Sequence, residues 1–191
     1  MLRLLPEAPG HVPARETLLD CCFGPDRHLK TSQMLRQGRL PAEGLAFSLL
    51  DGASLIGTLR FWHIAAGSAG PALLLGPIAV EPRWQREGAG AMLMRHGLAE
   101  ADRLGHAAVV LVGDAPYYGR FGFRQALTEG LVLPGPVERE RFLGLELTPG
   151  ALAGAVGAVV ATGATEDGAD AALSMSPMTE QTPIPTHAAA R

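Results

Sequence analysis

The hydrophobic and polar positions along the chain follow two different periods. Short apolar runs bounded by turn residues are typical of strands, and apolar residues three or four positions apart are typical of helices. Strand-like runs occupy residues 2–5, 45–51, 53–64, 71–80, 106–114, 141–147 and 155–162. Helical spacing occupies residues 13–23, 28–38 and 89–104, and residues 116–123 predict a short helix that runs into a further strand.

Two of these strands carry a specific signal. Asp51-Gly52 separates two strand-like runs and predicts a tight hairpin turn. Gly76-Pro77 interrupts the run at 71–80, and because proline cannot donate to a sheet ladder, that strand must bulge or lose a partner there. The alternation of strands and helices predicts an α/β (α+β) domain with helices on the faces of a central sheet.

The character of the chain changes near residue 164. Residues 1–163 form the predicted domain, and residues 164–191 hold three prolines, no aromatic residue and a net charge of −3. Such a segment buries too little apolar surface to offset its ordering entropy, so we expect a disordered, low-complexity tail. The whole chain also carries −3, so the domain is neutral.

Composition excludes several classes of partner. A net charge of −3 gives no basic footprint, so we expect no nucleic-acid partner. The weakly apolar run at 151–164 is shorter than the roughly 20 residues that span a bilayer, and the N-terminal residues lack the apolar region of a signal peptide, so we expect no membrane partner. Cys21 and Cys22 are adjacent and are expected to be buried, in a reducing, cytoplasmic setting. His96 and His106 lack a third ligand at metal spacing, so no metal is expected.

A glycine-rich turn joins the strand at 71–80 to the helix at 89–104. Gly88 and Gly90 would leave the first backbone N–H groups of the helix open to a bound anion, with Arg83 and Arg86 nearby. The interpretation is a phosphate cradle, and the alternative is a plain strand-to-helix connection with a glycine N-cap. The P-loop and dinucleotide motifs both fail, because the turn has no lysine and Leu93 stands where a third glycine belongs.

Two motifs, taken together, carry a family resemblance. Residues 85–90 (QREGAG) match the pattern Gln/Arg-x-x-Gly-x-Gly/Ala, and Tyr118 stands four residues before Gly122-Phe123. In this order, separated by one helix and one strand, they resemble the GNAT superfamily of acetyl-CoA-dependent N-acetyltransferases. The order of elements and the ending at 113–123 resemble the predicted acetyltransferases of the YhbS type. The resemblance runs from about Leu2 to Thr148.

The resemblance implies a GNAT fold, with a mixed, mostly antiparallel sheet flanked by helices, and acetyl-CoA as co-substrate without a metal. The reaction it implies is direct attack on the thioester by an amine acceptor, either a small molecule or a protein. Tyr118 would protonate the departing thiolate, or would only hydrogen-bond the sulfur. The residues implied to bind the cofactor are Ile78, Ala79, Val80, Gln85, Arg86, Gly88, Ala89, Gly90 and Ala91. Glu87 is a departure, because an acid that faced the phosphates would weaken binding.

Several roles stay open at this level. Glu81 and His63 are candidates for a general base, Asp114 could instead cap the short helix, and a water chain could serve. Tyr117 is expected to pack or to form a substrate wall. The acceptor site is expected at the first helices and around residues 61–71. A homodimer is compatible with the resemblance, and the alternative function is a non-catalytic acyl-CoA-binding module that acts as a sensor or partner domain.

Overall fold

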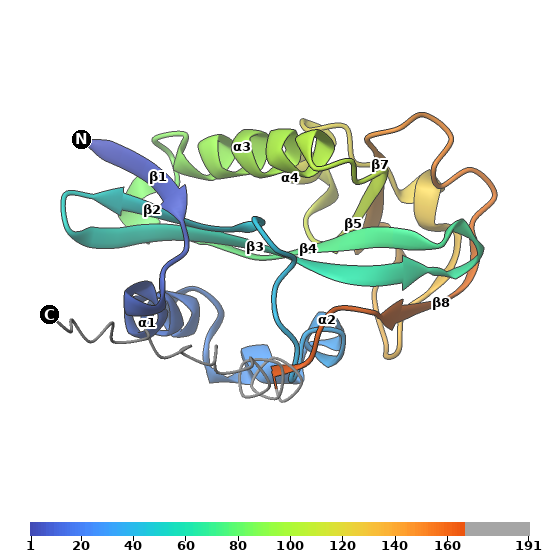
Figure 1. Cartoon of the computed structure of the whole chain (residues 1–191), viewed down its shortest axis with the longest axis horizontal. Helices are drawn as coiled ribbons and strands as arrows, with labels where there is room; N and C mark the ends of the chain where they lie inside the picture. The colour runs from blue at the N-terminus through green and yellow to red at the C-terminus, as the bar shows by residue number, and fades with distance from the viewer. Residues whose placement is uncertain (167–191) are drawn as a thin grey trace, which may run out of the picture.

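The structure, a computed structural model, describes residues 1–166 as a mixed sheet with helices on both faces (Figure 1). The strands are β1 (Leu2–Pro6), β2 (Ala46–Asp51), β3 (Ser54–Ala66), β4 (Pro71–Val80), β5 (Ala108–Val112), β6 (Gly130–Val132), β7 (Phe142–Glu146) and β8 (Val156–Ala161). The α-helices are α1 (Val12–Phe23), α2 (Thr31–Met34), α3 (Ala89–Arg103) and α4 (Ala115–Gly119).

The strands follow the order β1-β2-β3-β4-β5-β7, and β8 pairs with both β3 and β6. Neighbours along the main path are antiparallel except β4 and β5, which run parallel. Helix α3 covers one face of the sheet, while α1 and α2 lie on the opposite face (Figure 1). The predicted fold class, a mixed and mostly antiparallel sheet flanked by helices, is confirmed.

Helix α3 is held against the sheet by buried side chains and a close approach to β3. Leu93 and Met94 are fully buried in the same core cluster as Leu59 and Phe61 of β3. Gly97 lets the helix approach closely, because a Cβ there would lie 2.5 Å from a methyl carbon of Leu59. Each fully buried side chain of this kind contributes about 1.5–3 kcal/mol. The packing holds the N-terminus of α3 rigidly at the end of β4.

The interruption of β4 produces the predicted bulge and a splay from β5. The register between β3 and β4 shifts opposite Gly76-Pro77, whose peptide bond is cis. Strand β5 pairs with β4 only at Leu73 and Leu74. Among residues 1–166, the edge of β4 from Leu75 to Val80 therefore has no strand partner on the β5 side.

Two predicted elements differ from the structure. In place of one helix at 28–38 there is a 3₁₀ turn (Pro25–Leu29), an extended Lys30 and the short α2. The first residue of α2 contacts a distant segment, because the hydroxyl of Thr31 donates to the carbonyl of Pro136 at 2.5 Å. The strand expected after residues 116–123 is reduced to an isolated bridge between Arg124 and Gly144. Three-residue β6 was not predicted, because so short a strand has no detectable period.

The cysteine prediction is wrong. Cys21 is exposed and Cys22 is only half-buried. The thiol of Cys22 lies 3.5 Å from the carbonyl oxygen of Val80. Both residues are free cysteines at the C-terminal end of α1. The buried side of this helix is formed by Leu18 and Leu19, and Cys21 lies on the exposed side.

The end of the described chain is bonded to the segment that follows α2. The N–H of Leu40 donates to Ala164 at 2.9 Å, and the N–H of Glu166 donates to Gly38 at 3.1 Å. Ordered contacts thus extend past the predicted boundary at 163. The rest of the predicted tail lies outside the described residues. Between Met1 and Glu166, no helix has the length and apolar character to cross a bilayer.

Candidate acyl-CoA site

The N-terminus of α3 offers backbone donors and no side-chain cap. Gly88 is the N-cap residue, in the left-handed region at φ 81°, and makes no side-chain hydrogen bond to the helix. Ala89 is fully buried and packs into the core, while its neighbours Gly88 and Gly90 are exposed and half-buried. The first N–H groups of a helix have no intrahelical partner, and the helix end carries partial positive charge. This end of α3 is therefore suited to an anion.

Gly90 and Gln85 shape the same turn. A Cβ on Gly90 would lie 2.7 Å from the hydroxyl oxygen of Tyr117, so a larger side chain would close the approach to the turn. The side-chain amide of Gln85 donates to the carbonyl of Val80 at 3.0 Å, which ties the turn to the end of β4. Sequence analysis assigned Gln85 to the cofactor, and the structure gives it this bracing contact.

Charged side chains contribute less to the turn than the sequence suggested. Arg83 forms an ion pair with Glu81 at 2.8 Å, so its charge is already engaged. Arg86 and Glu87 are both exposed, and in the described residues no ion pair involves either of them. Backbone N–H groups are thus the main donors that this turn could offer to an anion.

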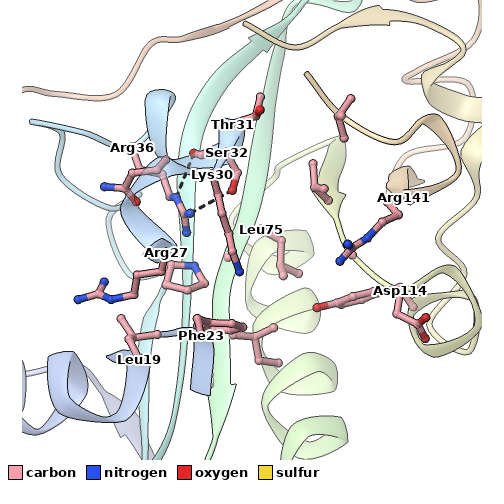
Figure 2. A pocket seen from close by; sticks show the side chains of 18 of the residues that line it. Leu19, Phe23, Arg27, Lys30, Thr31, Ser32, Arg36, Leu75, Asp114 and Arg141 are labelled. Carbon is pink, nitrogen blue, oxygen red and sulfur yellow. Dashed lines mark hydrogen bonds between the residues drawn. The ribbon is translucent and has the colours of Figure 1, made fainter. Parts of the chain in front are cut away.

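A cleft of about 1100 Å³ opens beside this turn (Figure 2). It is lined by α1 and the α2 region on one side, by β4, and by the start of α4 with residues 136–141 on the other side. Of the predicted residues, those that line the cleft are Ile78, Val80, Gln85, Gly90 and Tyr118. Ala79 instead packs against Leu18 and Leu19 of α1. Arg86, Gly88, Ala89 and Ala91 belong to the adjoining turn and first helical residues rather than to the cleft wall.

Tyr118 is held at the cleft by close packing. A Cβ on Gly113 would fall 2.1 Å from the Tyr118 ring, so glycine at the end of β5 is what admits the ring. The pKa of Tyr118 is raised to about 12, mainly by burial and in smaller part by the nearby Tyr117 and Asp114. Tyr118 therefore stays protonated at neutral pH and can act as a proton donor.

Asp114 has the capping role that the sequence allowed. Its carboxylate accepts the N–H of Tyr117 at 3.0 Å at the start of α4. Both tyrosines line the cleft, with ring centroids 5.0 Å apart. Tyr117, expected as packing or a substrate wall, is a wall of this cleft next to Gly90.

Neither candidate base reaches Tyr118. Glu81 is paired with Arg83, and His63 lies against His106 with ring centroids 5.4 Å apart, outside the cleft lining. The carboxylates that do line the cleft are those of Asp114 and Glu138. Over residues 1–166, no group of three or more His, Cys, Asp or Glu residues could hold a metal ion.

The segments predicted to form the acceptor site differ in their position relative to the cleft. The α1 and α2 segments do line the cleft, but residues 61–71 do not. Residues 61–66 continue β3, and the turn after them faces β8, since a Cβ on Gly67 would lie 2.2 Å from the carbonyl oxygen of Val156. Residues 136–141 form the wall instead.

Sequence reasoning also missed the cations Lys30, Arg36 and Arg141 of the cleft lining. These residues come from distant segments and share no motif. The one visible signal was that Lys30 is the only lysine of the sequence.

The sheet is mixed, β4 and β5 separate after Leu74, and a helix with a glycine N-cap begins beside this gap. This arrangement places the protein in the class of acyl-CoA N-acyltransferase folds. The model of the Acetyltransferase (GNAT) family matches residues 13–123, and the chain belongs to this family. It is 30% identical over 154 residues, 80% of this chain and 92% of the relative, to the uncharacterized N-acetyltransferase YhbS of Escherichia coli K12. It is 37% identical over 68 residues, 35% of this chain and 38% of the relative, to YjhQ of the same organism, also named an uncharacterized N-acetyltransferase.

Two solved structures resemble the whole domain. The crystal structure of E. coli YhbS in complex with CoA has a TM-score of 0.70 at 28% identity, covering 85% of this chain and 89% of that chain. A GNAT family acetyltransferase from Brucella melitensis in complex with acetyl-CoA has a TM-score of 0.60 at 26% identity, covering 78% and 90%. The predicted family, fold and enzyme class are confirmed. The individual site residues stay predictions.

Proposed function

We propose that the protein transfers the acetyl group of acetyl-CoA to an amine by direct attack of the amine on the thioester. One observation carries the proposal: the uncapped N-terminus of α3, the free edge of β4 and Tyr118 all adjoin one cleft. The CoA and acetyl-CoA complexes of the similar E. coli and B. melitensis proteins support this choice of co-substrate.

The residues of the turn and of β4 fit the two halves of the cofactor. The backbone N–H groups of Gly88, Ala89, Gly90 and Ala91 would bind the diphosphate, because that helix end is uncapped and positively polarised. The open edge from Leu75 to Val80 would pair with the amides of the pantetheine arm as an added strand. Glycine at position 90 keeps the approach between these two surfaces clear.

Acetyl-CoA would supply an acyl group activated as a thioester. A free backbone N–H between Ile78 and Val80 would donate to the oxygen on which negative charge develops during attack. The protonated hydroxyl of Tyr118 would deliver a proton to the departing thiolate, since burial keeps its pKa far above neutral pH. The proton lost by the amine has no assigned acceptor, although Asp114 and Glu138 line the same cleft.

The second candidate is an acyl-CoA-binding module without turnover. It is favoured by the position of Glu81 and His63, the two expected bases, outside the cleft. Release of free thiol from acetyl-CoA, measured against a library of primary amines, decides between the two. Amine-dependent release is expected for the enzyme. A thermal shift with CoA but no release with any amine would favour the module.

Three finer features stay predictions of the sequence. They are a cytoplasmic location, a homodimer, and the choice between a small-molecule and a protein acceptor. The last of these depends on the far end of the cleft, whose charges are considered next.

A further inference from the structure

The end of the cleft away from the α3 turn is lined by basic side chains. Lys30, Arg36 and Arg141 line it together, and we name them the cation cluster. Figure 2 shows Lys30 and Arg141 extending from opposite walls towards the same space beside Leu75. Arg27 also belongs to the lining, but it points away and is neutralised by Glu16 and Asp20 of α1, at 2.5 and 2.7 Å.

Arg36 is the least compensated member of the cluster. Its guanidinium donates only to the carbonyl and hydroxyl of Ser32, both at 3.1 Å and both neutral. Its Nη1 has no hydrogen-bond partner in residues 1–166 and lies 3.9 Å from the position of a Cβ on Gly76. Burial, with Arg27 and Arg60 as the charged neighbours, lowers the pKa of Arg36 to about 10. The side chain is thus a half-buried, charged donor with no acidic partner among residues 1–166.

Lys30 is more exposed than Arg36, and it also lacks an acidic partner among the described residues. It rests over the ring of Phe23, 4.6 Å from the centroid, and has no ion pair among the described residues. Burial and the neighbouring Arg141 and Arg36 lower the pKa of Lys30. The charged side chains that act on Lys30 are therefore themselves cations. Arg141 has only a long contact of 3.9 Å with Glu138. Lys30 and Arg141 are exposed, so water solvates their charges, and a bound anion would exchange that water for charge-assisted hydrogen bonds.

The location of the cluster separates it from the phosphates of CoA. Gly76, beside Arg36, precedes Val80 by four residues, which is about 13 Å along a strand. The diphosphate turn follows Val80, so the cluster lies at the other end of the cleft, where the acceptor enters. Apart from Arg27, which is paired, the described cleft lining holds three cations and two carboxylates, Asp114 and Glu138, a difference of one positive charge. That balance suits a monoanion.

Resting on the proposed acetyltransferase function, we infer that the acceptor is an amine that also carries a carboxylate, which the cation cluster binds. Arg36 and Lys30 hold the carboxylate by charge-assisted hydrogen bonds, and the amine at the other end of the molecule faces Tyr118. The cluster selects the acceptor and takes no part in the proton transfers.

The test compares acceptors that differ only in the carboxylate. We expect kcat/KM for ω-amino carboxylates of three to six carbons to exceed that for n-alkylamines of equal length by at least tenfold at one chain length, mainly through KM. Arg36→Met should raise KM for the carboxylate acceptor about tenfold or more and leave the n-alkylamine unchanged. The control is Arg95→Met, which removes the same charge from the exposed surface of α3 and should change neither.

Binding is measured separately, so that the two proposals can fail independently. Titration of the same compounds into the CoA-loaded protein should give heat for the amino carboxylate and a weaker response in Arg36→Met. If no amine turns over but this binding pattern holds, the acetyltransferase proposal fails and the carboxylate site stands. Equal use or binding of both acceptor types overturns the carboxylate site.

Two further outcomes also overturn the inference. If Arg36→Met abolishes the thermal shift with CoA, the cluster serves the cofactor. If the wild-type protein prefers succinyl-CoA with neutral n-alkylamines, and Arg36→Met removes that preference, the carboxylate belongs to the acyl group and not to the acceptor.

Discussion

The two ends of the cleft, the proposed cofactor end beside the α3 turn and the proposed acceptor end beside the cation cluster, are built from different chemical groups. At the cofactor end, the surface is formed mainly by backbone N–H groups and glycines. The contributing segments, 76–90 and 113–123, are each continuous in sequence. At the acceptor end, charged side chains dominate, and they come from residues 19–36 and 136–141, which are about a hundred positions apart. A hydrogen bond from Thr31 to Pro136 joins these two distant segments. Backbone geometry thus fixes one end, and long-range packing of side chains fixes the other.

The largest effect is expected from filling the cofactor end. Gly90→Val should abolish both the thermal shift with CoA and turnover, because the new side chain would occupy the approach to the α3 turn. The double variant with Tyr117→Phe removes the hydroxyl that the new side chain would meet, and should not restore binding. Gly119→Val, where a Cβ meets nothing within 4 Å, is the control. Intact CoA binding in Gly90→Val would contradict the assignment of the turn to phosphates.

The next effect concerns the hydroxyl of Tyr118. Tyr118→Phe should keep the thermal shift with CoA but slow turnover by about 100-fold or more, the scale of a lost general acid. Tyr117→Phe removes a hydroxyl from the neighbouring wall and should slow turnover far less. Steady-state kinetics with one amine distinguishes the two. Unchanged turnover in Tyr118→Phe would remove this residue from the mechanism and would favour hydrogen bonding by another group.

Alkaline unfolding measures how deeply Tyr118 is buried. Its pKa is about 12 in the folded protein and about 10 in an unfolded chain. Stability from such a group is fully present below the unfolded pKa and is lost as pH rises through the folded pKa. Between pH of about 10 and about 12, the wild-type protein should therefore lose roughly 2 kcal/mol more stability than Tyr118→Phe. Parallel pH curves of the two proteins in thermal melts would contradict this.

The smallest effect lies at the acceptor end, and it has the opposite sign. Because burial lowers the pKa of Arg36, its charged form is disfavoured by folding at neutral pH. Arg36→Met should therefore raise Tm by roughly 2–4 °C without ligand, equivalent to about 1 kcal/mol for a domain of this size. Arg95→Met should leave Tm within about 1 °C, as surface substitutions usually do. A fall in Tm for Arg36→Met would show that its bonds to Ser32 outweigh the cost of the buried charge.

This contrast also explains what the sequence could predict. The strands from β1 to β5, the hairpin at Asp51-Gly52 and the bulge at Gly76-Pro77 follow from period and turn chemistry, which are local properties. The helix expected at 28–38 fails because Thr31 exchanges helical continuation for contacts with residues 135 and 136, which no local pattern reveals.

The site divides in the same way. The positions of the α3 turn and of Tyr118 beside the cleft could be predicted because glycine spacing and a short signature encode them, and their roles stay predictions. The cation cluster could not be predicted, since its members share no spacing and meet only after the sheet has formed. Residues 61–71, predicted to contribute to the acceptor site, lie outside the cleft lining for the same reason, because their first six residues continue β3.

The hydrogen bonds that join residues 164 and 166 to residues 38–40 matter for anyone who shortens this protein. The bonded segment begins two residues after Arg36, and the side chain of Arg39 also donates to the carbonyl of Gly163 at 2.5 Å. A version that ends at Thr162 would lose these hydrogen bonds, and we expect the position of Arg36 to become less well fixed. The packing of the α3 turn would not change. Such a product would still bind CoA normally, yet its preference among amines would no longer represent the intact chain.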